Sequence, residues 1–424
     1  MVNKLQTINM KTYANNSCLT KKSYWDQKGL VPIDEFGNTI LHLAANENSL
    51  VNHEIVFYCM IKGLKDKNPR NNEGLTPLHI SALKGNLQIC KLFLGYVEDK
   101  NPKDFLGRTP LHFAAMEGHL SVCRLISKNV TDTNPIDLNG QTPLFLAARK
   151  GHQNVCRLLF FTLTSKIFFD LGRRRSKINV KNVNHKDNAG WTPLHFATGY
   201  NYISICKLII ENIEDANPEN NELTTPLHIA AQYGYLEICD LILNRIDHQP
   251  RDQFGWTPLH FASHSGHLEV CQTILNKFED KNPIANDRTT PIHLAARNGH
   301  TLVFLLLSES TDNINPKDVK GVTPLHEAAK EGHWLICQTI IGRVVDKNPK
   351  CNIGITPLHH AAENGHVGKY QLIIKHVEDK NPENVLGLTP LHFAEGHKNF
   401  DQIFQTVFSY DFKTRMRCKR PSGS

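Results

Sequence analysis

The hydrophobic positions around residue 110 predict two short helices. Ala114 and Ala115 follow Leu111 by three and four residues, so the three side chains share one face of a helix. Gly118 ends this helix, because glycine readily adopts the left-handed backbone conformation that closes a helix. A second apolar set follows the glycine and predicts the second helix: Val122, Cys123, Leu125 and Ile126.

The polar residues that flank these helices are typical of a helix start and of a turn. The Thr109 hydroxyl can accept a backbone N–H at the helix start. Pro110 suits the first helical turn, where its missing N–H would have no partner in any case. An Asn-Pro connection and a turn that ends in Gly107 come before the threonine. The unit is therefore a helix, a turn, a second helix and a tight connection.

Close copies of Thr-Pro-Leu-His-x-Ala-Ala recur along most of the chain. The steps between successive threonines are 37, 33, 33, 50, 33, 32, 33, 33, 33 and 33 residues. A period of 33 with this motif resembles the ankyrin-repeat family over roughly residues 34 to 408. The resemblance implies an all-α solenoid of helix-turn-helix units with short β-hairpin loops, in which each repeat contacts only its neighbours. The repeat threonines are Thr39, Thr76, Thr109, Thr142, Thr192, Thr225, Thr257, Thr290, Thr323, Thr356 and Thr389.

The repeat divides the chain into three parts. Residues 1–32 are polar and match no copy, so we expect a flexible N-terminal arm. Residues 33–408 hold eleven copies, and residues 409–424 form a basic tail that we expect to be disordered. The first copy has Ile40 in place of proline and the last lacks two residues of its first helix, as expected of terminal repeats whose outer face meets water.

The step of 50 residues indicates an insertion at about 161–177. Its sequence begins with apolar residues, ends in a basic run and does not continue the repeat. Four interpretations remain open: an extension of the preceding helix, a neutral loop, a functional docking loop and a translated non-coding segment. Solenoids tolerate insertions at surface connections, so none of these conflicts with the array.

Composition restricts the compartment and the class of protein. Hydrophobic residues make up 40% of the chain, which is sufficient for one elongated core. No run approaches the ~18 apolar residues that would span a membrane. Residues 1–22 lack the apolar stretch of a secretory signal. We therefore expect a cytoplasmic protein, with the nucleus as the alternative compartment.

Basic residues are concentrated in two segments, although the formal net charge of +7 is modest for 424 residues. Such runs are typical of solvated tails, and the alternative is contact with nucleic acid or an anionic membrane. The candidate basic contacts are Arg173, Arg174, Arg175 and Lys177 in the insertion, and Arg415, Arg417, Lys419 and Arg420 at the C-terminus.

The cysteines and histidines recur at fixed places, which indicates structural roles. Seven of the eleven cysteines lie fourteen residues after the repeat threonine, where a small soft hydrophobe packs inside a helix. No CxxC pair is present, and we expect no metal and no other cofactor. Ten histidines occupy the T-P-L-H place and seven follow the helix-ending glycine. The family resemblance implies that the T-P-L-H imidazoles hydrogen-bond the helix start to neighbouring backbone.

No pattern in the sequence indicates catalysis. A catalytic site needs unlike groups that converge, such as a nucleophile, a base and an orienting group, whereas here like groups recur in parallel. A Gly-rich phosphate loop, HExxH and GxSxG are all absent from the sequence. We therefore expect a non-enzymatic scaffold or regulatory subunit, monomeric, that binds other proteins. The alternative is a binder of nucleic acid or of an anionic membrane.

The resemblance implies that hairpin tips and first helices line a concave binding surface. Function should then be carried by exposed positions that differ between copies, and aromatic residues dominate many protein interfaces. We predict a partner-binding strip there; the alternative is that these aromatics merely pack between hairpins. The predicted contacts are Trp191, Tyr200, Tyr233, Phe254, Trp256 and His264.

Overall fold

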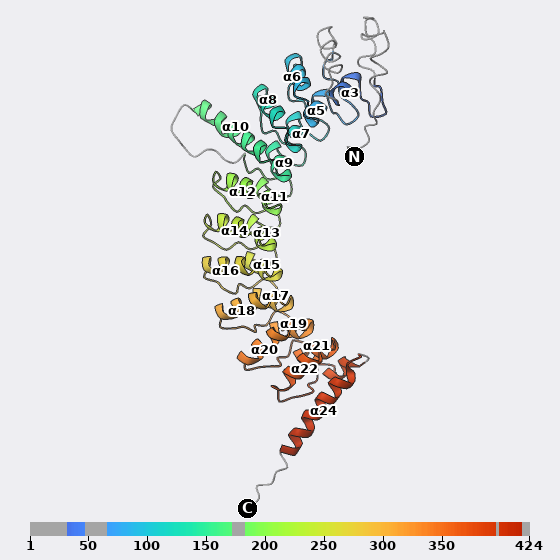
Figure 1. Cartoon of the computed structure of the whole chain (residues 1–424), viewed down its shortest axis with the longest axis vertical. Helices are drawn as coiled ribbons and strands as arrows, with labels where there is room; N and C mark the ends of the chain where they lie inside the picture. Colours follow the sequence, from blue (N-terminus) through green and yellow to red (C-terminus); the bar gives the residue numbers. More distant parts are fainter. Residues whose placement is uncertain (1–31, 47–65, 172–182, 396–397, 418–424) are drawn as a thin grey trace, which may run out of the picture. The chain divides into compact units, whose positions relative to one another are not determined.

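The computed structural model describes residues 32–46, 66–171, 183–395 and 398–417 (Figure 1). Two compact units divide the chain, one ending at Asp215 and one beginning at Ala216. In the described part of each unit the repeats are pairs of helices joined by loops.

The first unit contains the predicted pattern from the second copy onward. The first helices of its repeats pack on one another in order, α5 on α7, α7 on α9 and α9 on α11, and the second helices α6, α8, α10 and α12 form a parallel row (Figure 1). Its helices are α3 (Ile40–Asn46), α5 (Pro77–Leu83), α6 (Leu87–Tyr96), α7 (Pro110–Met116), α8 (Leu120–Asn129), α9 (Pro143–Lys150), α10 (Gln153–Leu171), α11 (Pro193–Gly199) and α12 (Ile203–Ile210).

The second unit repeats the arrangement. The odd-numbered helices from α13 to α23 pack in sequence, and the even-numbered helices from α14 to α24 lie beside them. Its helices are α13 (Pro226–Tyr233), α14 (Leu236–Leu243), α15 (Pro258–Ser265), α16 (Leu268–Lys277), α17 (Pro291–Arg297), α18 (Thr301–Ser310), α19 (Pro324–Glu331), α20 (Trp334–Arg343), α21 (Pro357–Glu363), α22 (Val367–Ile374), α23 (Pro390–Ala394) and α24 (Phe400–Arg417).

Helix α7 shows how the motif starts each first helix. Thr109 has an extended backbone, its hydroxyl accepts the backbone N–H of His112, and Pro110 occupies the first turn. The Thr109 N–H in turn donates to the His112 Nδ1 atom at 2.9 Å, so the threonine and the histidine cap the helix reciprocally. The cap thereby supplies side-chain acceptors to two backbone donors at the start of the helix.

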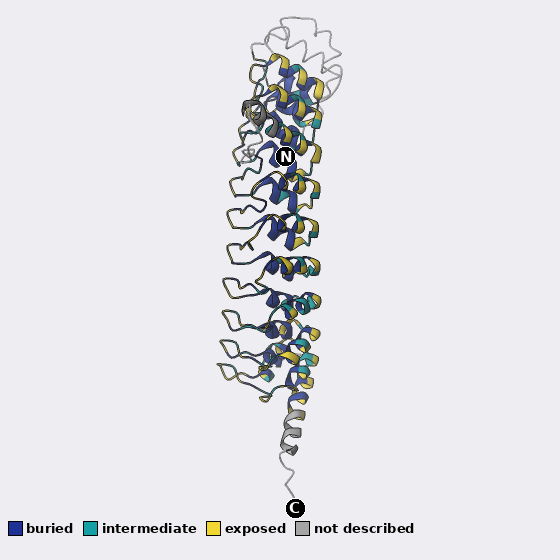
Figure 2. Ribbon diagram, turned by 90° about the vertical axis from the view of Figure 1, so that its left-hand side faces the viewer, coloured by how far each residue is buried: buried dark blue, intermediate teal, exposed yellow. Residues whose placement is uncertain are grey.

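The core lies between the two rows of helices within each unit. Leu111, Ala114 and Ala115 of α7 are fully buried, as are Cys123 and Ile126 of α8, and the two helices pack on each other, as the apolar spacing predicts. Figure 2 shows the buried residues on the facing sides of the helices and the exposed ones on the outer sides. The two alanines allow this close approach because their side chains add little volume.

The connections between repeats are turns, and the described residues contain no strand. At one tip the Asp104 N–H donates to the Arg108 carbonyl at 2.9 Å, and the Gly107 N–H donates to the Asp104 carbonyl at 3.0 Å. The Leu138 N–H of the next tip donates to the Leu106 carbonyl at 2.9 Å. This tip is thus closed on itself and tied to the next one.

Two helices extend beyond the repeat pattern. Helix α10 continues to Leu171, so the insertion at 161–177 begins as an extension of the preceding helix, and residues 172–177 lie outside the described part. Helix α24 continues to Arg417, so residues 409–417 are helical, in contrast to the disorder expected for this segment. Residues 1–31 of the predicted arm and residues 418–424 of the predicted tail lie outside the described part.

Candidate functional site

The T-P-L-H histidines use both ring nitrogens to hold repeats together. The His112 Nδ1 atom accepts the Thr109 N–H, and Nε2 lies 3.1 Å from the carbonyl oxygen of Gln141 in the next repeat, to which it donates. Burial lowers the pKa of His112 to about 4, which keeps Nδ1 free to accept. The implied structural role is confirmed, and the equivalent pairs are His42–Leu75, His79–Arg108, His228–Trp256, His260–Thr289, His293–Val322, His326–Ile355 and His359–Leu388.

The histidines after the helix-ending glycine form a second set of links, whose partners sequence reasoning missed. His119 Nε2 donates to the Leu83 carbonyl of the preceding repeat at 2.9 Å. Its ring lies so close to Gly85 that a Cβ there would be 2.6 Å from Nδ1. The constant spacing of histidine and glycine between copies was the available signal. The equivalent pairs are His152–Met116, His267–Gln232, His300–His264, His333–Arg297 and His366–Lys330.

The repeat cysteines are packing residues in the described helices, as predicted. Cys90, Cys123 and Cys271, for example, are fully buried and free. Burial raises the pKa of each of these thiols to about 12, so the nucleophilic thiolate is suppressed. Among the described residues no group of three or more His, Cys, Asp or Glu side chains is placed to hold a metal ion.

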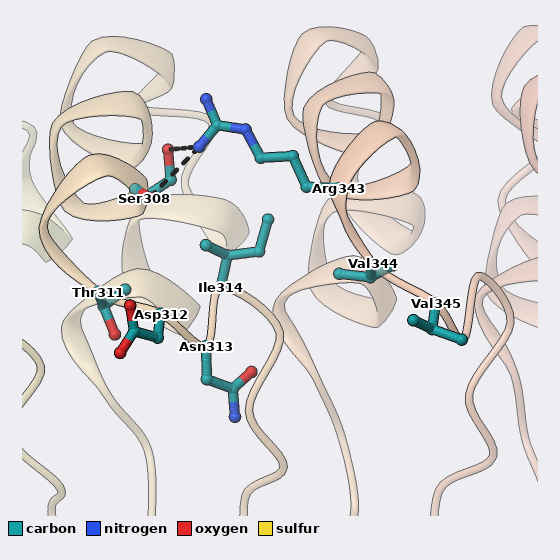
Figure 3. A pocket seen from close by; sticks show the side chains of 8 residues that line it. All are labelled: Ser308, Thr311, Asp312, Asn313, Ile314, Arg343, Val344 and Val345. Carbon is teal, nitrogen blue, oxygen red and sulfur yellow. Dashed lines mark hydrogen bonds between the residues drawn. The ribbon is translucent and has the colours of Figure 1, made fainter.

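One polar cavity of about 420 Å³ lies between the ends of α18 and α20 (Figure 3). Its Arg343 guanidinium donates to the carbonyl and to the hydroxyl oxygen of Ser308, at 3.3 and 3.2 Å. Figure 3 shows Asp312 and Asn313 on the far side of Ile314 from this guanidinium. The arginine therefore closes the junction of two repeats, and no nucleophile and base converge in the cavity.

In the first unit, the structure places the predicted contacts in two different environments. The half-buried Trp191 ring packs edge-on against His195 at 5.3 Å and lies 5.6 Å from the Phe196 ring. Tyr200 is 55% exposed and stacks on Tyr202 at 5.8 Å. The Trp191 ring is thus used mainly for packing within its repeat, whereas the Tyr200 ring is exposed to solvent.

In the second unit, Phe254 and Tyr233 are each more than half exposed. Phe254 is 63% exposed at a hairpin tip and Tyr233 is 53% exposed at the end of α13. Trp256 is half-buried and stacks on His260 with ring centroids 5.8 Å apart. His264 is exposed, but its Nδ1 atom is engaged by the Asn298 side-chain amide at 2.9 Å.

Phe254 and Trp256 line the same cavity, whose volume is about 570 Å³. The rings of Trp256 and Phe261 pack edge to face at 5.3 Å. Sequence reasoning missed the other members of the lining because it searched only for variable aromatic positions. The lining residues it missed are Glu222, Thr224, Asp252, Gln253, Phe261, Asn286 and Asp287.

The predicted basic contacts lie mainly outside the described residues. Arg415 and Arg417 belong to α24, although their side chains are outside the described part. In the described part of the chain, no helix is both long and apolar enough to span a membrane. The remaining basic candidates are outside the described residues altogether: Arg173, Arg174, Arg175, Lys177, Lys419 and Arg420.

The stacked helix pairs, the two histidine sets and the closed hairpin tips define a solenoid of helical repeats. The family model described as ankyrin repeats (3 copies) matches this chain seven times between residues 13 and 414. The chain therefore belongs to the ankyrin-repeat family, whose repeats are generally protein–protein interaction modules. No curated protein matches the sequence. The matched segments are 13–104, 89–169, 174–252, 200–287, 241–318, 279–351 and 325–414.

Proposed function

We propose that this array is a non-enzymatic scaffold or regulatory subunit that binds other proteins through its hairpin tips and first helices. The observation that carries the proposal is the difference between two kinds of position. Residues that recur between copies are buried or hydrogen-bonded within the stack, whereas Phe254 and Tyr233 differ between copies and are more than half exposed. Exposed aromatic residues supply contact area at a low cost in conformational entropy, which suits them to an interface.

The absence of convergent chemistry in the described residues supports the same proposal. The repeat histidines accept hydrogen bonds from backbone N–H groups and donate to backbone carbonyls, and burial keeps the repeat thiols protonated. A partner bound to such a surface would be recognised by shape and by contact with side chains. We propose the cytoplasm as the compartment, with the nucleus as the alternative.

Replacement of two aromatic residues tests the surface directly. Trp256→Ala combined with Tyr233→Ala should reduce retention of specific partners at least tenfold in quantitative affinity capture, since single interface aromatics contribute about 2 kcal/mol or more. Trp334→Ala with Tyr96→Ala is a matched control, because both residues are exposed but lie on second helices. The control should retain the same partners as the wild type.

Two further measurements separate the interpretations. Circular dichroism and thermal unfolding must be unchanged in the Trp256/Tyr233 variant. Phe254→Ser is a second test of the surface that a folding defect should not affect, because it changes only an exposed residue at a hairpin tip. If all variants retain partners equally, the surface is not the interface. Binding that falls steeply as salt rises and that requires residues 161–177 or 409–424 would instead favour the nucleic-acid or anionic-membrane alternative.

A further inference from the structure

The cavity at Trp256 combines aromatic rings with carboxylates on three successive hairpin tips. Glu222, Phe254 and Asp287 stand three residues before the threonines of consecutive copies, so two acidic residues flank an aromatic one. Trp256 and Phe261 complete the apolar part of the lining. An aromatic face beside a carboxylate is the environment that proteins use for organic cations.

An equivalent place in the third repeat already holds a guanidinium. The Arg108 Nη2 and Nε atoms lie 2.7 and 2.8 Å from the Oδ2 atom of Asp104. The same guanidinium lies over the Phe113 ring, 4.5 Å from its centroid. Asp104 and Phe113 stand five residues before and four residues after the repeat threonine.

In the seventh repeat, the carboxylate and the ring are present, but the cation is not. Asp252 and Phe261 have the offsets of Asp104 and Phe113, and Trp256 stands in the place of Arg108. Asp252 is 8% exposed, and its Oδ1 atom accepts the N–H groups of Phe254 and Trp256 at 2.9 and 2.7 Å. Within the described residues its Oδ2 atom has neither a hydrogen bond nor an ion pair, whereas Oδ2 of Asp104 receives the arginine.

The neighbouring basic side chain is committed elsewhere. Arg251 donates to the carbonyl oxygens of Gly255 and Ile284, at 3.2 and 2.7 Å, and lies 3.9 Å from Asp280. It does not line the cavity. None of the lining carboxylates has an ion-pair partner among the described residues.

In another pair of repeats, an arginine of the preceding copy lies over the ring that is equivalent to Phe261. Arg149, seven residues after its threonine, lies over Phe196 of the next repeat at 5.3 Å from the ring centroid. Arg297, at the same offset, bonds Glu327 of the next repeat at 2.6 Å. Before Phe261 the equivalent position holds the uncharged Gln232. At the seventh repeat, therefore, neither the residue before the threonine nor the preceding copy supplies a guanidinium to this ring.

We propose that this cavity binds the guanidinium of an arginine side chain that a partner protein inserts between Trp256 and the carboxylates of Glu222, Asp252 and Asp287. The inference rests on the proposed function and specifies the chemistry of the partner. Arginine fits better than lysine because its planar fork pairs with carboxylates and stacks on aromatic rings, as Arg108 does within the chain.

The test uses short peptides and the whole chain labelled with 5-fluorotryptophan. The chain has four tryptophans, and Trp256→Phe assigns the Trp256 signal in the fluorine NMR spectrum. An acetylated and amidated Gly-Gly-Arg-Gly-Gly peptide should shift the Trp256 signal, with an affinity on the order of millimolar for one side chain. The lysine peptide should bind several-fold more weakly, and the citrulline peptide, which has the same shape without the charge, should cause no shift.

Asp252→Asn is the decisive variant because an asparagine already performs the structural role in another copy. In the second repeat, Asn71 Oδ1 accepts the N–H groups of Glu73 and Leu75 at 3.0 and 2.9 Å, so the hairpin should remain folded. The variant should weaken the arginine peptide about tenfold, which corresponds to the loss of a charge-assisted bond. Asp318→Asn, the same change at the ninth repeat, should have no effect.

The outcomes separate this inference from the proposed function. Equal shifts with the arginine and citrulline peptides, or no shift with either, would overturn the arginine site. If partner capture still depends on Trp256 in that case, the protein-binding surface stands without the arginine site. If the arginine peptide binds but no captured protein depends on Trp256 or Tyr233, the site stands and the proposed interface falls.

Discussion

Leu223 and Arg288 hold a backbone conformation that glycine occupies at the other described hairpin tips. Their φ angles are 60° and 64°, close to the 76° of Gly107. The Leu223 N–H donates to the Asn220 carbonyl at 3.0 Å, as Gly107 does to Asp104, so the turn is unchanged. The same turn is therefore kept with a side chain in the left-handed region, which is a strained backbone conformation. A left-handed residue with a Cβ costs roughly 1–2 kcal/mol.

Glycine substitution at these two sites should therefore stabilise the array. Leu223→Gly and Arg288→Gly should each raise the free energy of unfolding by up to about 1 kcal/mol, since the relief of strain exceeds the extra entropy of the unfolded chain. Urea unfolding followed by circular dichroism measures the change. Gly354→Ala is the opposite control, because its Cβ would lie 2.9 Å from the Asn384 Cα atom. Destabilisation by both glycine variants would contradict the argument.

At the scale of the helix, the reciprocal threonine and histidine cap makes stability depend on pH. Burial lowers the pKa of His79 and His112 to about 4, and that of His260 and His326 to about 3. The unfolded chain, with histidine pKa values near 6.5, therefore binds more protons than the folded chain between pH 6.5 and about 4. A protonated Nδ1 atom cannot accept the threonine N–H, so the helix start is lost together with the link to the next repeat.

The free energy of unfolding should be constant just above pH 6.5 and should fall as pH decreases below it. Each buried histidine contributes about 1.4 kcal/mol per pH unit in this window. Asp137 and Asp252, whose pKa values are raised by burial, act in the opposite direction but are fewer. Urea midpoints at about pH 7.5, 6 and 5 check the slope. A midpoint that stays constant between pH 6.5 and 5 would show that the caps tolerate protonation.

The helices and their caps could be predicted because they depend on short sequence spacings within each repeat. The offsets of Thr109, Leu111 and Cys123 recur in other copies, and local spacing determines which face of each helix is buried. The acidic and aromatic cavity could not be predicted in this way. It depends on three successive tips and on an oxygen of Asp252 that lacks the arginine present beside Asp104. The sequence shows the equivalent carboxylates, but only the structure shows which of them has no cation as a partner.

For the molecule as a whole, the repeat contacts predict that stability is local. Each first helix packs on the first helices next to it within its unit, and the His326 ring joins Thr323 to Ile355 of the following repeat. In such a stack, the loss of one link weakens the nearest interfaces and leaves distant repeats unaffected. The buried cysteines, one in most repeats, can report this opening because their thiols are inaccessible in the folded state.

His326→Ala should therefore expose one cysteine selectively. The variant leaves the Ile355 carbonyl without its imidazole donor, and we expect a loss of about 2 kcal/mol or more. Alkylation of Cys337, in the same repeat, should become at least tenfold faster, while the rates at Cys90 and Cys123 should not change. Pulsed alkylation with peptide mass spectrometry measures each site in one experiment. His248→Ala removes an exposed imidazole and should leave all rates unchanged. An equal acceleration at every buried cysteine would instead show that the array opens as a single cooperative unit, because only global unfolding reaches all of them at once.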